Sequence, residues 1–237
     1  MSPTTKTIGL DPAKMSAFIA MPTHRPLEPE TVVSLIGTVH ELDSRGIRWT
    51  VEFKARGSLI HHSRSKVAED FRVSEHTHMF WIDSDMVWQP ADFLRLLALA
   101  TVMPCVTAAY TAKCDPPQFL MSVDGPVVEA NAYGCLPIGG QGLGFTCVQR
   151  QVIETLARHA PRCNFPDVPA PIPHIFRLDD VPGRDGVLDA RGEDIAFFAD
   201  VRDHGFEVWL DPNITLGHIG TKTYQASILD FMQHQPE

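Results

Sequence analysis

Two aspartates separated by one residue give this sequence its strongest chemical signal. Asp83-Ser84-Asp85 directly follows the apolar run Met79–Ile82, which predicts a buried strand. Two carboxylates at a strand end can converge on a hard divalent cation, whose other coordination positions stay open to phosphate oxygens. The alternative is an Asx-type turn with two solvated acids.

A second acidic pair and a glycine-flanked histidine lie near the end of the chain. Glu193 and Asp194 begin a predicted helix, where a carboxylate can act as a general base or can cap the first turn. His218 lies between Gly217 and Gly220, and glycines permit close approach of the backbone to a ligand. The residue type alone favours an ordinary, partly buried ring bonded to a loop carbonyl.

Basic and glycine-rich segments offer candidate contacts for an anionic ligand. Arg64 carries a fork of donors that suits a phosphate or a base edge, unless it is solvated at a helix start. The adjacent His61 and His62 have no clear third ligand, so they are interpreted as polar loop residues. Gly139–Gly144 lacks the strand–turn–helix unit of a dinucleotide-binding loop. Its glycines indicate either an open site, in which Gln141 is exposed to a donor, or a tight turn.

The first half of the chain predicts the elements that position these residues. Strand-like apolar runs alternate with segments of helical periodicity, in the order β-α-β-α-β-α-β. This order predicts a mostly parallel sheet covered by helices on both faces, with ligands beyond the carboxyl ends of the strands. The predicted strands are Ser16–Met21, Ile47–Phe53, Met79–Ile82 and Cys105–Tyr110, and the predicted helices are Thr31–Leu42, Ser63–Ser74 and Ala91–Ala100. Pro22 is expected to end the first strand.

The second half is predicted to be less regular. Six prolines between Pro161 and Asp189 predict a long irregular loop, and loops of this length often act as functional lids. The other predicted elements are a hairpin over Pro116–Asn131, helices over Gln149–Ala160 and Glu193–His204, a strand over Glu207–Leu210 and a docking helix after Tyr224.

Length and composition exclude several classes of protein. The 237 residues, 44% of them hydrophobic, fit one globular domain of about 200–250 residues. Five cysteines without a C-x-x-C pair predict reduced thiols in a cytoplasmic protein and not a disulfide scaffold. No apolar run reaches the about 20 residues that cross a bilayer. The net charge of -9 disfavours general adhesion to nucleic acid or anionic lipid.

The order of three segments resembles that of the GT-A fold glycosyltransferases. Phe80–Met86 resembles their metal-binding D-x-D segment, and Gly192–Phe198 looks like their E-D segment. Trp209–Pro212, followed by Gly217–Gly220, is similar to their terminal strand and metal-ligating histidine. The resemblance covers most of the chain and implies a Rossmann-like, three-layer α/β/α fold with a mostly parallel sheet.

The resemblance also implies roles for particular residues. Asp83, Asp85 and His218 would hold Mn²⁺ or Mg²⁺, and Asp194, assisted by Glu193, would be the catalytic base. Residues 15–115 would form the nucleotide-sugar-binding half, and residues 116–237 the acceptor-binding half with a mobile loop over 161–189. The donor contacts would come from Pro22, Thr23, Arg25, Arg64, Asp83, Ser84, Gly140 and Gln141.

The implied activity is transfer of a sugar from a nucleotide-sugar, preferably a UDP-sugar, to a hydroxyl group. The acceptor would be a glycan, a glycolipid or a hydroxymethylated base in DNA. One alternative is a nucleotidyltransferase, but Ala20–Arg25 lacks the glycines typical of its first loop. The other is a non-catalytic nucleotide-sugar-binding module, which the full set of acids and the histidine disfavours.

Overall fold

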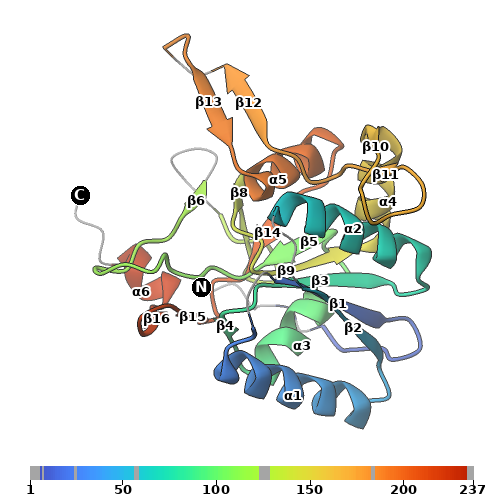
Figure 1. The fold of residues 1–237 in the computed structure, drawn as a ribbon. Helices are drawn as coiled ribbons and strands as arrows, with labels where there is room; N and C mark the ends of the chain where they lie inside the picture. The colour runs from blue at the N-terminus through green and yellow to red at the C-terminus, as the bar shows by residue number, and fades with distance from the viewer. Residues whose placement is uncertain are drawn as a thin grey trace.

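A seven-stranded sheet at the centre of the protein confirms the predicted α/β class (Figure 1). The computed structural model describes residues 6, 8–23, 26–55, 59–122, 129–182 and 185–233. Five of the seven strands run in the same direction, and β9 and β7 run antiparallel to their neighbours. In spatial order the strands are β2 (Arg48–Ala55), β1 (Ser16–Thr23), β3 (His78–Ile82), β9 (Phe145–Gln149), β5 (Cys105–Thr107), β14 (Val208–Leu210) and β7 (Leu136–Pro137).

Helices cover both faces of this sheet, as the alternating pattern predicts (Figure 1). Successive strand residues point to opposite faces, so Ala17, Ile19 and Met21 enter one core while Phe18 and Ala20 enter the other. The first core is closed by α1 (Pro29–Ser44) and α3 (Pro90–Leu99). The second is closed by α2 (Ile60–Val73), α4 (Arg150–His159), α5 (Glu193–Asp203) and the short α6 (Ile228–Gln233).

The predicted elements of the first half are confirmed, with two differences. Pro22 does not end the first strand, because β1 continues to Thr23 in register with β2. Pairing with β3 stops at Ala20, so at Pro22 the strand has a neighbour on one side only, where a residue without an N–H is tolerated. The second difference is β9, an antiparallel strand between β3 and β5 that the sequence analysis did not predict.

The second half is more ordered than predicted. Between α4 and α5, β10 (Arg162–Cys163) pairs with β11 (Ile172–Pro173), and β12 (Asp179–Pro182) pairs with β13 (Leu188–Arg191). The expectation of a wholly irregular loop is therefore wrong. The hairpin predicted over 116–131 is also not seen in its described residues, because β6 (Met121–Ser122) pairs with the distant β8 (Gly140–Gln141).

A small three-stranded sheet lies beyond the carboxyl end of β3. It contains β4 (Met86–Val87), β15 (Gly217–Ile219) and β16 (Thr223–Gln225). The docking helix expected after Tyr224 is present as α6, whose Ile228 is buried. In the described residues, no helix is both long enough and apolar enough to cross a membrane.

Candidate active site

The turn that carries the two aspartates is held by backbone hydrogen bonds to three other segments. Asp83 N–H donates to the carbonyl of Gly144 (3.1 Å), and Ile219 N–H donates to the carbonyl of Asp85 (2.8 Å). Glu28 N–H donates to the carbonyl of Ser84 (3.2 Å). The turn therefore meets the loop after β1, the glycine-rich segment and β15 at one edge of the sheet, where parallel α/β sheets bind ligands.

His218 faces Asp85 across a short gap. Pairing of β15 with β4 sets His218 opposite Met86 and brings its Nε2 to 3.6 Å from Asp85 Oδ1. The other ring nitrogen, Nδ1, lies 2.8 Å from the carbonyl oxygen of Thr111, which can only accept, so Nδ1 carries the hydrogen. With Nδ1 used in this way, Nε2 is the ring nitrogen that faces the carboxylate, either as a donor when protonated or as a ligand atom when bare.

Lys113 is the second partner of Asp85, and sequence reasoning did not identify it. Its ammonium group pairs with Oδ2 of the carboxylate. Burial alone would raise the pKa of Asp85, but the hydrogen bonds with His218 and Lys113 outweigh it and lower the pKa to about 2. Asp85 is therefore ionised at neutral pH and available to a cation.

Asp83 does not share a compact ligand set with Asp85 and His218. Its Oδ1 accepts from Arg64 Nη2 (3.0 Å). In the described part of the chain, the one group of three ligand atoms within 4.8 Å of one another lies elsewhere and contains no aspartate. Asp85 and His218 therefore face each other as a pair, Arg64 holds Asp83 beside them, and the three-residue metal site stays a prediction.

Arg64 binds protein carboxylates through both of its terminal nitrogens. Its side chain is 5% exposed and donates to Asp83 and, through Nη1, to Glu193 Oε1 (3.1 Å). Burial opposes the charge of Arg64, but the neighbouring carboxylates outweigh it and raise its pKa. Carboxylates thus occupy these two donor nitrogens, as a buried guanidinium requires, and the phosphate or base contact stays a prediction. Arg64 instead ties the D-x-D turn to the start of α5.

Asp194 is not ion-paired with Arg64, unlike its neighbour Glu193. Its Oδ1 accepts from the N–H of Ile195 (2.8 Å), and within the described residues no ion pair includes its carboxylate. Burial raises the pKa of Asp194, and the charge of Glu193 adds to this while Arg64 opposes it. A half-buried carboxylate with a raised pKa and no ion-pair partner is typical of a general base.

Tyr110 lies among these acids and also escaped the sequence analysis. Its hydroxyl accepts from the N–H of Gly144 (3.2 Å), and its ring meets that of His218 edge-on at 5.2 Å. Burial, reinforced by Asp83, raises the pKa of the phenol, so the hydroxyl stays protonated. A Cβ at Gly142 would lie 2.0 Å from Tyr110 Oη, and one at Gly144 would lie 2.9 Å from Asp83 Oδ2. The two glycines thus leave the space that Tyr110 and Asp83 occupy.

Replacing Gly142 with alanine is expected to displace Tyr110 and to destabilise the protein by about 1–3 kcal/mol, the usual cost of overpacking. Urea denaturation of the variant measures this change. The double variant Gly142→Ala, Tyr110→Phe removes the nearest clashing atom and is expected to recover part of the loss. An alanine variant as stable as the parent would show that Tyr110 has room to move.

Gly140 and Gln141 have structural roles that exclude the predicted exposed position. Gln141 is 3% exposed, and its amide nitrogen donates to Thr107 Oγ1 and to the carbonyl of Ala108. A Cβ at Gly140 would lie 2.9 Å from Phe198 Cβ, so this glycine allows α5 to pack closely. The expected donor contact from Gln141 is therefore wrong for its amide nitrogen, because both hydrogens are used inside the sheet.

The remaining predicted donor contacts come from the loop after β1 and from the D-x-D turn. Pro22 and Thr23 end β1 at the same sheet edge as Asp83, and both are buried. Arg25 lies outside the described residues. Ser84 is half-buried and, with Asp85 and Lys113, lines a cavity of about 430 Å³ whose other walls include Pro26, Glu28, Gly220 and Tyr224. This cavity is large enough for a small ligand.

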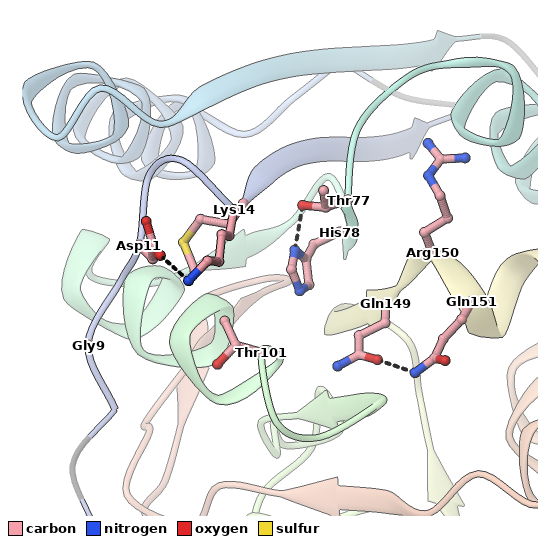
Figure 2. A pocket seen from close by; sticks show the side chains of 10 residues that line it. Gly9, Asp11, Lys14, Thr77, His78, Thr101, Gln149, Arg150 and Gln151 are labelled. Carbon is pink, nitrogen blue, oxygen red and sulfur yellow. Dashed lines mark hydrogen bonds and ion pairs between the residues drawn. The ribbon is translucent and has the colours of Figure 1, made fainter.

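A second cavity, of about 480 Å³, lies at the opposite edge of the sheet (Figure 2). Thr77 and His78 at the amino end of β3 line it, together with Gln149 at the end of the antiparallel β9. None of the acids described above borders this cavity. We therefore assign the candidate site to the cavity beside Asp85.

The charges at this edge fit a divalent cation. In the described part of the chain, the Lys and Arg side chains that pair with the carboxylates of Asp83, Asp85 and Glu193 are Arg64 and Lys113. Asp194 adds a fourth carboxyl group, and the gap between Asp85 and His218 offers one oxygen and one nitrogen ligand. Mg²⁺ and Mn²⁺ sites of this kind use one or two protein ligands and complete their shell with phosphates and water.

Comparisons with known proteins give likenesses in structure alone. No family model matches the chain, and no curated protein matches it. Similar solved structures include GalNAc-T7 with UDP, GalNAc and Mn²⁺ (11% identity, TM-score 0.49), with 87% of this chain and 44% of that chain covered. Another is a glycosyltransferase involved in the glycosylation of the major capsid of PBCV-1 (12% identity, TM-score 0.32), with 59% of this chain and 62% of that chain covered.

A third similar structure is a protein of Bacillus anthracis designated a glucose-1-phosphate thymidylyltransferase, in complex with sucrose. It is 9% identical with a TM-score of 0.37, and 62% of this chain and 76% of that chain are covered. The chain thus spans less than two thirds of the length of the first two structures. Likenesses at these identities concern the fold, and activity has to be argued from the site.

Proposed function

We propose that the protein is a metal-dependent glycosyltransferase that moves a sugar from a nucleotide-sugar to a hydroxyl group. The observation that carries the proposal is that two aspartates in different surroundings, Asp85 and Asp194, lie at one edge of the sheet. Asp85 faces His218 at 3.6 Å with room for a cation, and the half-buried Asp194 forms no ion pair with any residue that the structure describes. A cation held by Asp85 and His218 would stabilise the negative charge of a leaving diphosphate. Asp194 would take the proton of the acceptor hydroxyl.

Asp85 and His218 would hold the cation. A mixed set of one carboxylate and one imidazole favours Mn²⁺ over Mg²⁺, which prefers oxygen ligands. When bound, the metal supplies positive charge that stabilises the departing nucleoside diphosphate. The carbonyl of Thr111 keeps Nε2 of His218 turned toward Asp85, as outer hydrogen bonds do in metal sites.

Lys113 and the cavity beside Asp85 would receive the diphosphate of the donor. The side chain of Lys113 is 34% exposed and borders the cavity, so its ammonium group can reach an anion there. Ser84, Gly220 and Thr221 add backbone and hydroxyl groups to the same wall. A UDP-sugar is the proposed donor, on the strength of the D-x-D resemblance.

Asp194 would remove the acceptor proton as the hydroxyl attacks the anomeric carbon. Glu193 and Arg64 hold the start of α5, so they position Asp194 and do not react themselves. A base in this role implies an inverting reaction. The proposed acceptor is a hydroxyl of a glycan or glycolipid, and a hydroxymethylated DNA base is the second candidate.

Nucleotide binding that depends on Mn²⁺ tests the proposal. With UDP at about 100 times its Kd, linkage adds about 2.7 kcal/mol of stability, and a protein of this size gains about 2–4 °C in Tm per kcal/mol. We expect such a shift with UDP and Mn²⁺ and a smaller one with GDP or CMP. Asp85→Ala and His218→Ala should lose it, whereas Asp203→Ala, an exposed acid at the end of α5, should keep it.

The alternatives give different results in the same experiment. A nucleotidyltransferase is expected to gain thermal stability from a nucleoside triphosphate. When a sugar phosphate is added as the second substrate, it should release pyrophosphate from the triphosphate. A non-catalytic module would bind the nucleotide-sugar without hydrolysing it. Equal Mn²⁺-dependent shifts in the parent and in Asp85→Ala would contradict the metal assignment.

A further inference from the structure

Three histidines from two separate segments meet on the surface of α2, away from the candidate active site. His61 and His62 belong to the first turn of α2, and His174 directly follows β11. One nitrogen from each ring lies within 4.8 Å of the other two. The ring centroids are 4.4 Å apart for His61 and His62 and 5.6 Å apart for His62 and His174. His174, the third histidine, lies 112 residues after His62, so their spacing in the sequence does not show that they meet.

His174 carries a buried ring nitrogen with no partner. Its Nδ1 contacts Cys163 Sγ at 3.7 Å, while its Nε2 is buried without a hydrogen bond. Buried polar atoms are nearly always satisfied, so an orphaned imidazole nitrogen beside two other imidazoles indicates an absent partner. Phe165 packs against the rings of His62 and His174, at 5.0 and 5.5 Å, and fixes their positions.

Burial lowers the pKa of His62 and of His174, and the neighbouring ring charges add to the effect. Neutral imidazole is the form that binds metal ions. No carboxylate takes part in this group. Three nitrogens without oxygen suit a borderline transition metal and do not suit Mg²⁺ or Ca²⁺.

We propose that His61, His62 and His174 form a transition-metal site, with Zn²⁺ as the expected ion. Zn–N bonds of about 2.0–2.1 Å in a tetrahedron place ligand nitrogens about 3.4 Å apart, so nitrogens that lie within 4.8 Å of one another need to approach by at most about 1.4 Å. Cys163 stands outside the group and fixes His174 through Nδ1, which leaves Nε2 for the metal. A water molecule would take the fourth position.

The site would fasten the segment between α4 and β12 to α2. This segment is already joined to the helix by a hydrogen bond from Phe176 N–H to Ser65 Oγ (3.1 Å) and by the ion pair of Lys66 with Asp167. Arg64, which holds Asp83 and Glu193, lies in the same turn of helix. The metal would therefore stabilise the backbone that carries the arginine without touching the acids.

Zinc binding by untagged, chelator-treated protein tests the site. Isothermal titration with ZnCl₂, and with CoCl₂ as a spectroscopic probe of tetrahedral nitrogen ligation, is expected to give one tight equivalent. His174→Ala and His62→Ala should each weaken binding at least tenfold. His159→Ala is the matched control, because His159 and His204 form a ring pair at 4.5 Å without a third histidine in the described residues.

Two further variants separate this site from the candidate active site and from misfolding. Asp85→Ala should retain the zinc equivalent, and circular dichroism should show that His174→Ala is folded. If His174→Ala does not fold, the more peripheral His61→Ala gives the same test. The proposal would be overturned if the parent did not bind zinc tightly, or if the folded histidine variants bound it as well as the parent. Loss of zinc binding in Asp85→Ala, or equal weakening in His159→Ala, would also overturn it.

Discussion

Replacing Asp194 with asparagine is expected to lower the rate of sugar transfer by about 10²–10⁴-fold, the range that a general base contributes. Asparagine has nearly the same shape, and its amide oxygen can still accept from the N–H of Ile195. The variant cannot take a proton. UDP and Mn²⁺ binding should therefore stay within about twofold of the parent, because Asp194 belongs to neither the cation pair nor the cavity wall.

The pH profile gives a second readout of the same assignment. Burial raises the pKa of Asp194, so the base is protonated and inactive at a higher pH than an exposed aspartate would be. The kcat/KM of the parent should fall as the pH drops through this raised pKa, and the acid limb should be missing from the residual activity of Asp194→Asn. Asp203→Asn, on the same helix but exposed, should behave as the parent. Full activity in Asp194→Asn would refute the base, and loss of UDP binding would point to a structural role.

Replacing Arg64 with methionine is expected to destabilise the protein by about 3–5 kcal/mol, the usual cost of removing one partner of a buried ion pair. Methionine preserves most of the volume but leaves Asp83 and Glu193 without the donors that hold them at 3.0 and 3.1 Å. Arg177→Met is the matched control, because Arg177 pairs with Asp200 near the surface and such a pair contributes about 0–1 kcal/mol.

Urea denaturation of the parent and of both variants at pH 7.5 measures the two losses. A deficit in Arg64→Met that is no larger than the deficit in Arg177→Met would contradict the buried pairing of Arg64 with Asp83 and Glu193.

The sequence predicts the helices and parallel strands of the first half because each has a clear period. Apolar runs such as Phe18–Met21 are buried on both faces of the sheet, and the amphipathic segments become α1 to α3. β9 was not predicted, because Phe145–Gln149 follows a glycine-rich segment and its antiparallel direction depends on contacts with β3 and β5. Local periodicity carries no information about such distant pairing.

Only some residues of the candidate site carry a signal in the sequence, because the others depend on contacts between distant segments. The D-x-D turn, Asp194 and His218 are candidates because their residue types and the order of their segments resemble a known family. Lys113 and Tyr110 were not candidates, because a lone lysine or tyrosine in a loop carries no signal until the fold places it beside Asp85 or Asp83. Arg64 was a candidate, but a sequence does not show that an arginine will be buried between two acids.

The position of β9 also affects how the protein can be synthesised. β3 and β5 do not pair with each other, and residues 145–149 fill the space between them. A nascent chain that has emerged only as far as β5 therefore exposes one edge of β3 and both edges of β5, because β14 also comes later in the chain. At translation rates of about 5–20 residues per second, the gap between β3 and β5 stays open on the order of several seconds. Residues 15–115 on their own would keep these edges exposed, so this half is expected to need chaperones until β9 inserts.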